Sequence, residues 1–365
     1  MNSVDFNILN EYLRDTGDRI RRRLGILPFL QQLGAGPIQD RLLDYVVRGG
    51  KNLRPALTMM ACGAVGGNPD DALDIGIAIE ITHTWTLVHD DIIDRDDSRR
   101  NGPSVHARIR EDYADWELNN PGMTVDHLAL SMALLVGDAQ HAMAMEIMAR
   151  AGRAGIIPAD LVLYLIAELE GAVLPALLTG EVDDVFQTGI PLGKITRDEI
   201  LLMLQRKTAA LLTYSVTAGG MIGLGIADPQ HPMIHSLRTY SDNLGIAFQL
   251  RDDILGIEGD EIKLGKPVGS DFREGKRTLA VKIAWDNGSG AEKTAIESLL
   301  GKPELTMDEV NHLRHLVESL GGIEAVSAMA SHRIETALAA LEDLPRSRYR
   351  DILAAVADYT IRRRK

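Results

Sequence analysis

The sequence lacks what several protein classes require. Its one cysteine, Cys62, excludes an internal disulfide and a cysteine-based zinc site. No apolar run approaches the roughly 18 residues of a transmembrane helix, and the segment from Met1 to Asp5 lacks a basic stretch followed by an apolar core. We therefore expect no transmembrane segment and a cytoplasmic protein. The net charge of −13 disfavours nucleic acid as a partner.

Aromatic residues and prolines are also scarce, and both shortages favour helices. Aromatics make up 4% of the chain, whereas Ala, Leu, Ile and Met are abundant, and alternating runs typical of strands are absent. Apolar residues recur at helical spacing, as at Leu201, Leu204 and Leu212. The chain is predicted to be all-α, with one domain over residues 1–365. Long proline-free intervals, each able to hold a helix, are 70–102, 122–157, 192–228, 233–266 and 304–344.

One proline falls inside an otherwise helical stretch. Pro175 interrupts the segment 160–185, and it lacks the backbone N–H that an α-helix needs at that point. We expect a kink or a break there, and no domain boundary.

Two acidic clusters stand out against this apolar background. Asp90, Asp91 and Asp94 follow one another within five residues, and Asp252-Asp253 lies far downstream in an equally apolar setting. On a helix, two aspartates one turn apart have Cβ atoms about 6 Å from each other, and like charges this close repel by about 3 kcal/mol at an effective dielectric near 20. A cation would relieve this repulsion, and hard carboxylate oxygens favour Mg²⁺, which commonly joins carboxylates to substrate phosphates.

Basic residues flank the first cluster on both sides. Lys51 and Arg54 follow a pair of glycines upstream, and Arg99-Arg100 comes within two helical turns downstream. Arginine offers a planar fork suited to phosphate, and lysine a point charge. The alternatives are a solvated basic turn upstream and surface ion pairs downstream.

Taken together, these motifs resemble those of the trans-type isoprenyl diphosphate synthases, over most of the chain. The resemblance implies the isoprenoid synthase type I fold, a bundle of long helices around a central cavity, and a homodimer. The first half of the pattern consists of Gly50-Lys51-x-x-Arg54, Glu80-x-x-His83, and Asp90-Asp91-x-x-Asp94 followed by Arg99-Arg100. The second half consists of Gly180-Glu181-x-x-Asp184, Lys207-Thr208, Phe248-Gln249-x-x-Asp252-Asp253, Gly265-Lys266-Pro267 and Gly275-Lys276-Arg277-Thr278.

The resemblance also implies a set of roles. Isopentenyl diphosphate and an allylic diphosphate would be the substrates, and three Mg²⁺ ions the cofactors. Carboxylates expected to bind metal are Asp90, Asp91, Asp94, Asp252 and Asp253. Residues expected to bind the diphosphate groups of the substrates, chiefly that of isopentenyl diphosphate, are Lys51, Arg54, His83, Arg100 and Lys276. Residues expected to act at the ionising allylic group, besides Asp90, Asp94 and Asp252, are Arg99, Lys207, Thr208, Gln249 and Lys266.

Two positions bear on details of the reaction. The second acidic motif often ends in a further aspartate, but Gly256 stands there, and neither Glu258 nor Asp260 has the spacing to replace it. Trp85 and Thr86 precede Asp90 by five and four positions, a pattern similar to synthases that stop at geranylgeranyl diphosphate. Ordinary core packing is the alternative for Trp85.

Three rival functions remain. Farnesyl diphosphate synthase differs only in product length. A terpene cyclase shares the helical fold, but would carry an Asn/Ser/Glu metal motif in place of Asp252-Asp253. A non-catalytic subunit would tend to lose aspartates from the first cluster, and this chain retains all three. The basic end, Arg362 to Lys365, is either a lid over the diphosphates or a solvated terminus.

Overall fold

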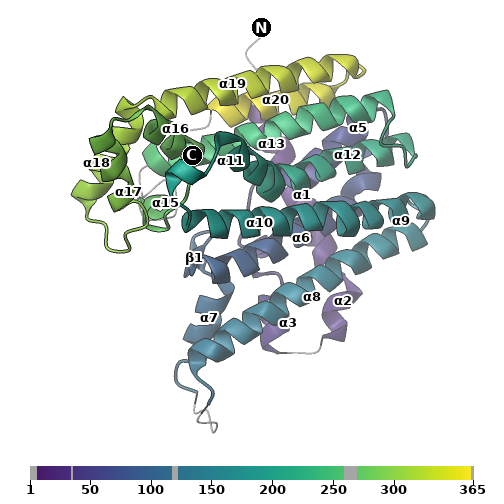
Figure 1. Ribbon diagram of the computed structural model, residues 1–365. Helices are drawn as coiled ribbons and strands as arrows, with labels where there is room; N and C mark the ends of the chain where they lie inside the picture. The colour runs from purple at the N-terminus through teal and green to yellow at the C-terminus, as the bar shows by residue number, and fades with distance from the viewer. Residues whose placement is uncertain (1–5, 34–35, 117–121, 259–268, 363–365) are drawn as a thin grey trace. The chain divides into compact units, whose positions relative to one another are not determined.

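The computed structural model of this protein describes residues 6–33, 36–116, 122–258 and 269–362. Within these ranges nearly every element is a helix, and the only strands are the two-residue pair β1 and β2, so the all-α prediction is confirmed (Figure 1). The chain divides into two compact units. We call Asn7–Ile166 with Ala218–Ala227 the N-terminal unit, and Ala167–Thr217 with Asp228–Lys365 the C-terminal unit. One domain over 1–365 stays a prediction.

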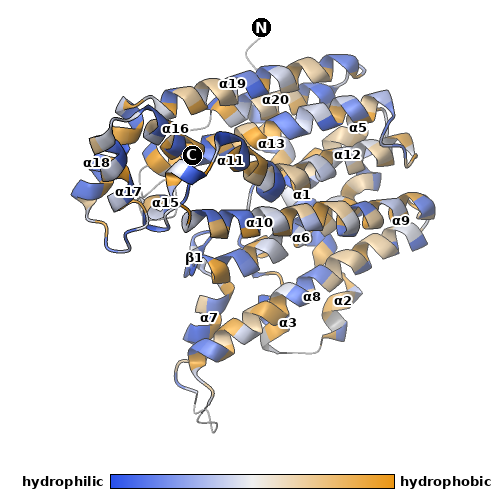
Figure 2. Ribbon diagram, viewed as in Figure 1, coloured by the Kyte–Doolittle hydropathy of each residue, from blue (hydrophilic) through white to orange (hydrophobic). Residues whose placement is uncertain are grey.

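The N-terminal unit is built around α6, which packs along α8 and against α5. Buried side chains of α6 include Ile75, Ile77, Ile79 and Ile81. Figure 2 colours each residue by hydropathy and shows hydrophobic and hydrophilic residues mixed along most of the helices. The elements are α1 (Phe6–Leu24), α2 (Pro28–Gln32), α3 (Pro37–Arg41), α4 (Asp44–Val47), α5 (Leu53–Ala64), η1 (Pro69–Ala72), α6 (Leu73–Ile93), β1 (Ser98–Arg99), β2 (Gly102–Pro103), α7 (Val105–Asp112), α8 (Val125–Arg153) and α9 (Ala159–Glu168), whose last two residues belong to the other unit.

The C-terminal unit is organised by α13, which packs along α19 and against the turn η4. Its elements are the π-helical turn η2 (Leu169–Val173), α10 (Leu174–Thr188), η3 (Leu192–Lys194), α11 (Arg197–Leu204), the π-helical turn η4 (Gln205–Ala209), α12 (Ala210–Leu224), α13 (Pro232–Glu258), α15 (Ser270–Arg273), α16 (Leu279–Asn287), α17 (Gly290–Leu299), α18 (Met307–Ser319), α19 (Gly322–Ala340), η5 (Leu341–Asp343) and α20 (Arg348–Arg362). The last residues of α12, from Ala218, belong to the N-terminal unit.

Local sequence explains several helix starts. Ser or Thr caps the first turn of α7, α8, α11, α16, α17 and α18, and three of these starts carry the full capping box with a glutamate three residues on. Pro175 lies in the first turn of α10, directly after the π-turn η2, where its missing N–H is tolerated. The helical stretch nevertheless runs without a gap from Ala159 to Thr188, so the structure shows a π-turn where a break was expected, and a kink at Pro175 stays a prediction.

Two helical stretches, Val125–Arg153 and Ala159–Thr188, could cross a membrane by length and composition alone. Of the apolar window in each, 39% is buried within the protein. Core helices of globular proteins pass the same test, so this is weak support for a membrane span.

Candidate functional site

The first acidic motif lies at the C-terminal end of α6. Asp90 and Asp91 are in the last turn, and Asp94 is the C-cap residue. Arg95 adopts the left-handed conformation with φ of 59°, and the Asp96 N–H donates to the Asp91 carbonyl at 2.9 Å, which closes a Schellman-type cap. The C-terminal end of a helix carries partial negative charge, so carboxylates gathered there favour a bound cation.

Asp91 differs from its two neighbours because it is fully buried. Its carboxylate accepts hydrogen bonds from the Tyr45 hydroxyl and from the Arg99 guanidinium, whose Nε lies 2.6 Å away. Arg99 also lies 3.6 Å from Asp90 and 3.3 Å from Asp96. Burial raises the pKa of Asp91 to about 6, although Arg99 and Tyr45 both oppose that rise. One of the three aspartates is therefore compensated by the protein itself.

A two-residue hairpin places the paired arginines. Strands β1 and β2 pair Ser98 with Pro103 and Arg99 with Gly102, and both turn residues, Arg100 and Asn101, have positive φ. The Arg100 side chain donates to the Tyr45 carbonyl and lies 3.4 Å from Glu80.

Arg100 also lies against the backbone of Gly50. A Cβ at this glycine would lie 2.9 Å from the Arg100 guanidinium carbon, so any side chain there would displace the Arg100 side chain. The predicted basic motifs at Gly50 and at Arg99-Arg100 therefore meet in the N-terminal unit.

Arg54 and His83 belong to the same cluster of charge. Burial lowers the pKa of Arg54 to about 10, while Glu80 opposes this and Arg100 adds to it. Burial also lowers the pKa of His83 well below its usual value, and the charges of Arg54, Arg100 and Arg99 act in the same direction. His83 is thus neutral at pH 7, beside three guanidinium groups that favour an anion. Lys51 lies exposed on the loop before α5.

The second acidic motif lies on α13 in the C-terminal unit. The Thr208 hydroxyl donates to the Gln249 side-chain oxygen at 2.9 Å, and the Gln249 amide donates to Asp253 at 2.9 Å. The π-turn η4 holds both Thr208 and Lys207. Lys207 points to α10, where its Nζ lies 2.8 Å from Glu181 and 2.7 Å from Asp184.

Asp253 shows how crowded this region is with negative charge. Burial raises the pKa of Asp253 to about 8, with Asp271, Asp252 and Asp184 adding to the rise and the bond from Gln249 opposing it. Among these causes, all within the described residues, none is a positive charge. A divalent cation would supply the missing positive charge, so the donor set fits Mg²⁺.

Gly256, the departure from the usual second motif, has an acidic neighbour. A Cβ at this position would lie 2.5 Å from the Asp271 carboxylate oxygen. Asp271 comes from α15, fifteen positions beyond Gly256 in the chain. The space that a side chain at position 256 would fill is thus taken by a carboxylate from another helix.

The two residues expected to set product length lie on different sides of α6. The Trp85 ring packs on His141 of α8, with centroids 4.8 Å apart, and edge-on to His89 at 5.9 Å. Thr86 bonds back to the His83 carbonyl at 2.8 Å. Thr86 lies about 40° around the helix from Asp90, whereas Trp85 lies about 140° from it.

The remaining predicted residues fall in the C-terminal unit or outside the described residues. Lys276 pairs with Glu274 at 2.8 Å. Lys266 lies outside the described residues, as do Asp260 and 363–365 of the basic end, while Arg362 closes α20.

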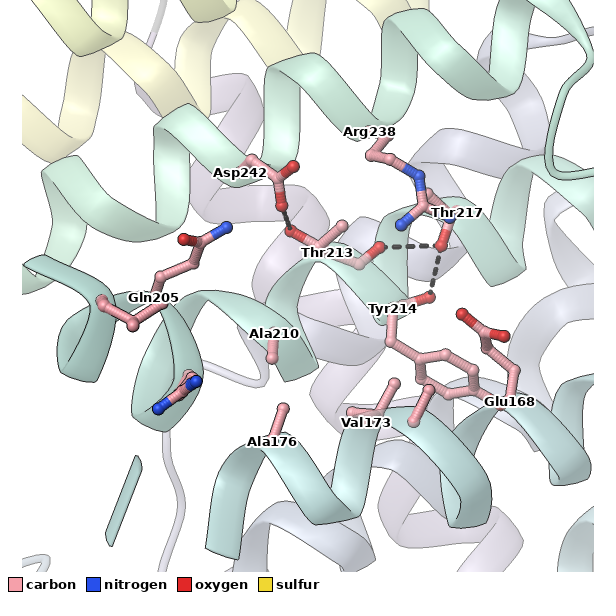
Figure 3. Close-up of a pocket in the computed structure, with 13 residues that line it drawn as sticks. Glu168, Val173, Ala176, Gln205, Ala210, Thr213, Tyr214, Thr217, Arg238 and Asp242 are labelled. Atoms are coloured by element: carbon pink, nitrogen blue, oxygen red, sulfur yellow. Dashed lines mark hydrogen bonds between the residues drawn. The ribbon is translucent and has the colours of Figure 1, made fainter. Parts of the chain in front are cut away.

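A cavity of about 330 Å³ lies in the C-terminal unit, and its lining includes Gln205 and Arg206 of η4, the turn that carries Lys207 and Thr208. Figure 3 shows Thr213 donating to Asp242 and Thr217 bonded to backbone carbonyls, with Glu168 and Arg238 on the rim. Its thirteen lining residues include none of the predicted site residues.

Sequence reasoning missed several residues that the structure brings to these clusters. In the sequence, Glu181 and Asp184 form part of the family pattern without an expected role, although two acidic residues one helical turn apart can themselves indicate a charged site. Tyr45 and Asp271 are isolated in the sequence, and nothing near them in the chain marks their partners.

Comparison with known proteins agrees with this arrangement. The profile of the polyprenyl synthetase family matches residues 37–317. The chain is 32% identical to a short chain isoprenyl diphosphate synthase of Methanothermobacter thermautotrophicus, over 98% of both chains. It is 33% identical to the geranylgeranyl diphosphate synthase of Sulfolobus acidocaldarius, again over 98% of both.

Solved structures give the same result. The geranylgeranyl pyrophosphate synthetase of Pyrococcus horikoshii superimposes with a TM-score of 0.80 at 30% identity, over 98% of both chains. The geranylgeranyl pyrophosphate synthase of Corynebacterium glutamicum, solved with isoprenyl diphosphate and magnesium, gives 0.83 at 27% identity, over 97% of this chain and 99% of that one.

These relatives are prenyltransferases, and that is the class of enzyme defined here by the helical fold and the acidic motifs. The chain belongs to the polyprenyl synthetase family.

Proposed function

We propose that this protein condenses isopentenyl diphosphate with an allylic diphosphate to give a short trans prenyl diphosphate, with geranylgeranyl diphosphate as the main product. One observation carries the proposal. Within the N-terminal unit, Arg54, Arg100 and neutral His83 form an anion site, and Arg99 ties the hairpin that carries Arg100 to the carboxylates at the end of α6. Two diphosphates, one of them bound through metal, match this pairing of charges.

In this mechanism Mg²⁺ supplies positive charge to the allylic diphosphate as it leaves. Asp90 and Asp94 would hold metal in the N-terminal unit, and Asp252 and Asp253 would hold it in the C-terminal unit. Three ions are the expected number. Asp91, which is held by Tyr45 and Arg99, orients Arg99 and is not a ligand, and Asp271 takes the place of the missing last aspartate of the second motif.

The other residues bind substrate and protect the cation. Lys51, Arg54, His83 and Arg100 hold isopentenyl diphosphate, while Lys207, Lys266, Lys276 and Arg99 add positive charge around the diphosphates. Thr208 and Gln249 present oxygen dipoles to the allylic carbocation without a full negative charge, and holding the double bond beside it lowers the barrier by several kcal/mol. The released diphosphate takes the final proton.

The test is one incubation of the purified protein with Mg²⁺, isopentenyl diphosphate and dimethylallyl, geranyl or farnesyl diphosphate. Elongated prenyl diphosphates support the proposal, with a C20 product dominant. Cyclic hydrocarbons would indicate a terpene cyclase, and no product would indicate a non-catalytic subunit.

Trp85 and His141 support the C20 product. The Trp85 ring is held between α6 and α8 by its contact with His141, which fixes a bulky group about 7.5 Å along the α6 axis from Asp90. Replacing Trp85 with Ala should shift product toward C25 and longer chains. Trp116→Ala, which removes an exposed tryptophan of the same unit, is the matched control and should leave the product at C20. A Trp85→Ala enzyme that still stops at C20 would show that another residue sets the length.

A homodimer is part of the proposal. Leu178, Val182, Val185 and Phe186 form a stripe on α10, and each is at least 45% exposed. Exposed apolar stripes of this kind mark association surfaces. Phe186→Glu should convert the dimer to a monomer in light scattering, and a wild-type monomer would contradict this part. A cytoplasmic location, consistent with one buried cysteine, also remains a proposal.

A further inference from the structure

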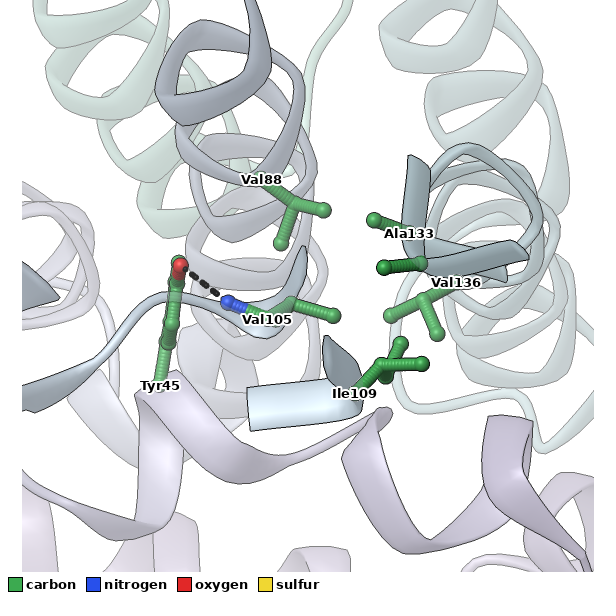
Figure 4. Close-up of a cluster of buried hydrophobic side chains, with 7 residues drawn as sticks. Tyr45, Val88, Val105, Ile109, Ala133 and Val136 are labelled. Carbon is green, nitrogen blue, oxygen red and sulfur yellow. Dashed lines mark hydrogen bonds between the residues drawn. The ribbon is translucent and has the colours of Figure 1, made fainter. Parts of the chain in front are cut away.

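Tyr45 is linked to both arginines of the hairpin region: to Arg100 directly, through its carbonyl, and to Arg99 through Asp91. Its ring is 1% exposed and packs in a core cluster with Val88, Val105 and Val136 (Figure 4). Its hydroxyl accepts from the Val105 N–H at 3.0 Å and donates to Asp91. Its backbone carbonyl accepts from Arg100. Tyr45 therefore joins α4, the end of α6 and the start of α7.

These two links have different chemistry. The link to Arg100 uses a main-chain atom, which no side-chain substitution removes. The link to Arg99 runs through the hydroxyl, because that group and Arg99 are the two hydrogen-bond donors to the buried Asp91 carboxylate. Without the hydroxyl, the Asp91–Arg99 pair would lose its anchor in the core, and the direction of the Arg99 fork would depend on its longer contacts with Asp90 and Asp96.

The hairpin itself needs such support. Arg100 and Asn101 have φ of 51° and 59°, a conformation that residues other than glycine seldom adopt. Such a backbone persists only when surrounding contacts determine it. Arg99 is held by Asp91, and Arg100 by Glu80 and the Tyr45 carbonyl.

We propose that the Tyr45 hydroxyl is a positioning group for the allylic diphosphate site: it fixes Asp91, Asp91 fixes Arg99, and Arg99 is thereby aimed at the allylic diphosphate. This inference rests on the proposed function and deepens it. Tyr45 does not touch substrate or metal. Its side chain acts on the allylic diphosphate through Asp91 and Arg99. Its backbone carbonyl holds Arg100, which is expected to bind isopentenyl diphosphate, and this carbonyl is unchanged when the hydroxyl is removed.

The test compares Tyr45→Phe with Tyr240→Phe. Both tyrosines are almost fully buried and each donates one hydrogen bond from its hydroxyl; Tyr240, in the C-terminal unit, donates to the Leu353 carbonyl at 2.8 Å. Tyr45→Phe should raise KM for the allylic diphosphate about tenfold, as expected for one lost bond to a charged group, and should leave KM for isopentenyl diphosphate unchanged. Tyr240→Phe should change neither KM, although both variants lower Tm.

A double-mutant cycle with Asp91→Asn sharpens the result. If the hydroxyl acts through Asp91, removing it from the Asp91→Asn enzyme should cause little further rise in the allylic KM. The Mg²⁺ concentration at half-maximal rate should stay the same in Tyr45→Phe, because Tyr45 holds no metal.

Several outcomes would overturn the inference. An allylic KM of Tyr45→Phe within twofold of wild type, or an equal rise in both KM values, would make Tyr45 a packing residue only. If Tyr45→Phe does not fold, Asp91→Asn alone tests the same link and must raise the allylic KM selectively. A wild-type enzyme without condensation activity would refute the proposed function. An active wild-type enzyme whose Tyr45→Phe variant shows no selective rise in the KM for the allylic diphosphate would refute this inference alone.

Discussion

The two acidic motifs share the pair Asp-Asp at the end of a long helix, yet the protein treats them differently. At the first motif, Asp91 is compensated by Arg99 and Tyr45. At the second motif, the hydrogen-bond donor to Asp253 among the described residues is the neutral amide of Gln249, and three further carboxylates act on it. Burial raises the pKa of both groups, to about 6 and about 8 respectively.

A carboxylate can thus be held by a positively charged side chain, as Asp91 is, or stay without such a partner in a crowd of negative charge, as Asp253 does among the described residues. The first motif is partly organised before any ligand arrives, because an arginine supplies the charge. The second motif carries an unfavourable charge density that a cation would relieve. Metal should therefore matter for activity at both motifs, but for folding stability mainly at the second one.

The largest effect on activity should come from removing Asp90, a proposed metal ligand, while Asp91 stays in place. Asp90→Ala should lower kcat/KM by about 10³, a loss of about 4 kcal/mol of transition-state stabilisation. Its unfolding free energy should change by less than about 1 kcal/mol, since the lost ion pair with Arg99 at 3.6 Å and the removed repulsion act in opposite directions. Steady-state kinetics and urea unfolding measure the two quantities. Activity within tenfold of wild type would show that Asp90 is not a ligand.

Breaking the compensated site should instead destabilise the fold. Arg99→Leu leaves the Asp91 charge buried without its main partner, and should cost about 3 kcal/mol at pH 7 in urea unfolding. The cost should shrink at pH 5, where Asp91 can be protonated. Arg110→Leu is the control, because its ion pairs with Asp97 and Asp126 are exposed and should be worth less than about 1 kcal/mol. Equal losses for both variants would contradict the comparison.

The uncompensated site predicts a pH dependence with a definite sign. Because the folded-state pKa of Asp253 is raised to about 8, the folded protein binds its proton more tightly than the unfolded chain does. Asp253 therefore contributes most to stability below about pH 4, and this contribution falls as pH rises toward 8.

The Asp253→Asn variant tests this sign in metal-free protein. It should be more stable than wild type at pH 8, by on the order of a few kcal/mol, and should lose this advantage near pH 4. Thermal unfolding in EDTA measures both. Mg²⁺ should raise the Tm of wild type more than that of the variant. A difference in Tm between wild type and Asp253→Asn that does not change with pH would show that the pKa of Asp253 is not raised in the folded protein.

The smallest effect concerns the missing aspartate. Gly256→Asp restores the common motif, yet its Cβ would lie 2.5 Å from the Asp271 carboxylate, so we expect a loss of about 1 to 3 kcal/mol and no gain in activity. Adding Asp271→Ala should recover part of the stability. A stable and more active Gly256→Asp enzyme would show that Asp271 does not replace the missing last aspartate of the second motif.

The helices and most site residues could be predicted because their signals are local. The interval 192–228, free of proline and apolar at helical spacing, holds α11, η4 and α12. Asp90 and Asp94 are one turn apart in any helix, so their shared face follows from spacing alone. The site roles themselves, including those of Lys266 and the basic end, stay predictions.

Long-range partners could not be predicted. Tyr45 reaches Asp91 across 46 positions, and nothing in the segment around it indicates a polar partner. Asp271 fills the space at Gly256 only because α15 packs there. The β1–β2 hairpin has strands of two residues, too short to show any period. Such contacts depend on tertiary packing, which a single sequence does not show.

The π-turn η4 limits how this protein can vary. Its extra residue sets the direction of Lys207 toward α10 and of Thr208 toward α13. Deleting or inserting one residue between Gln205 and Ala209 would turn both side chains by about 100° and separate them from their partners. Functional homologues should therefore differ in this stretch by exchanges of residues and keep its length constant.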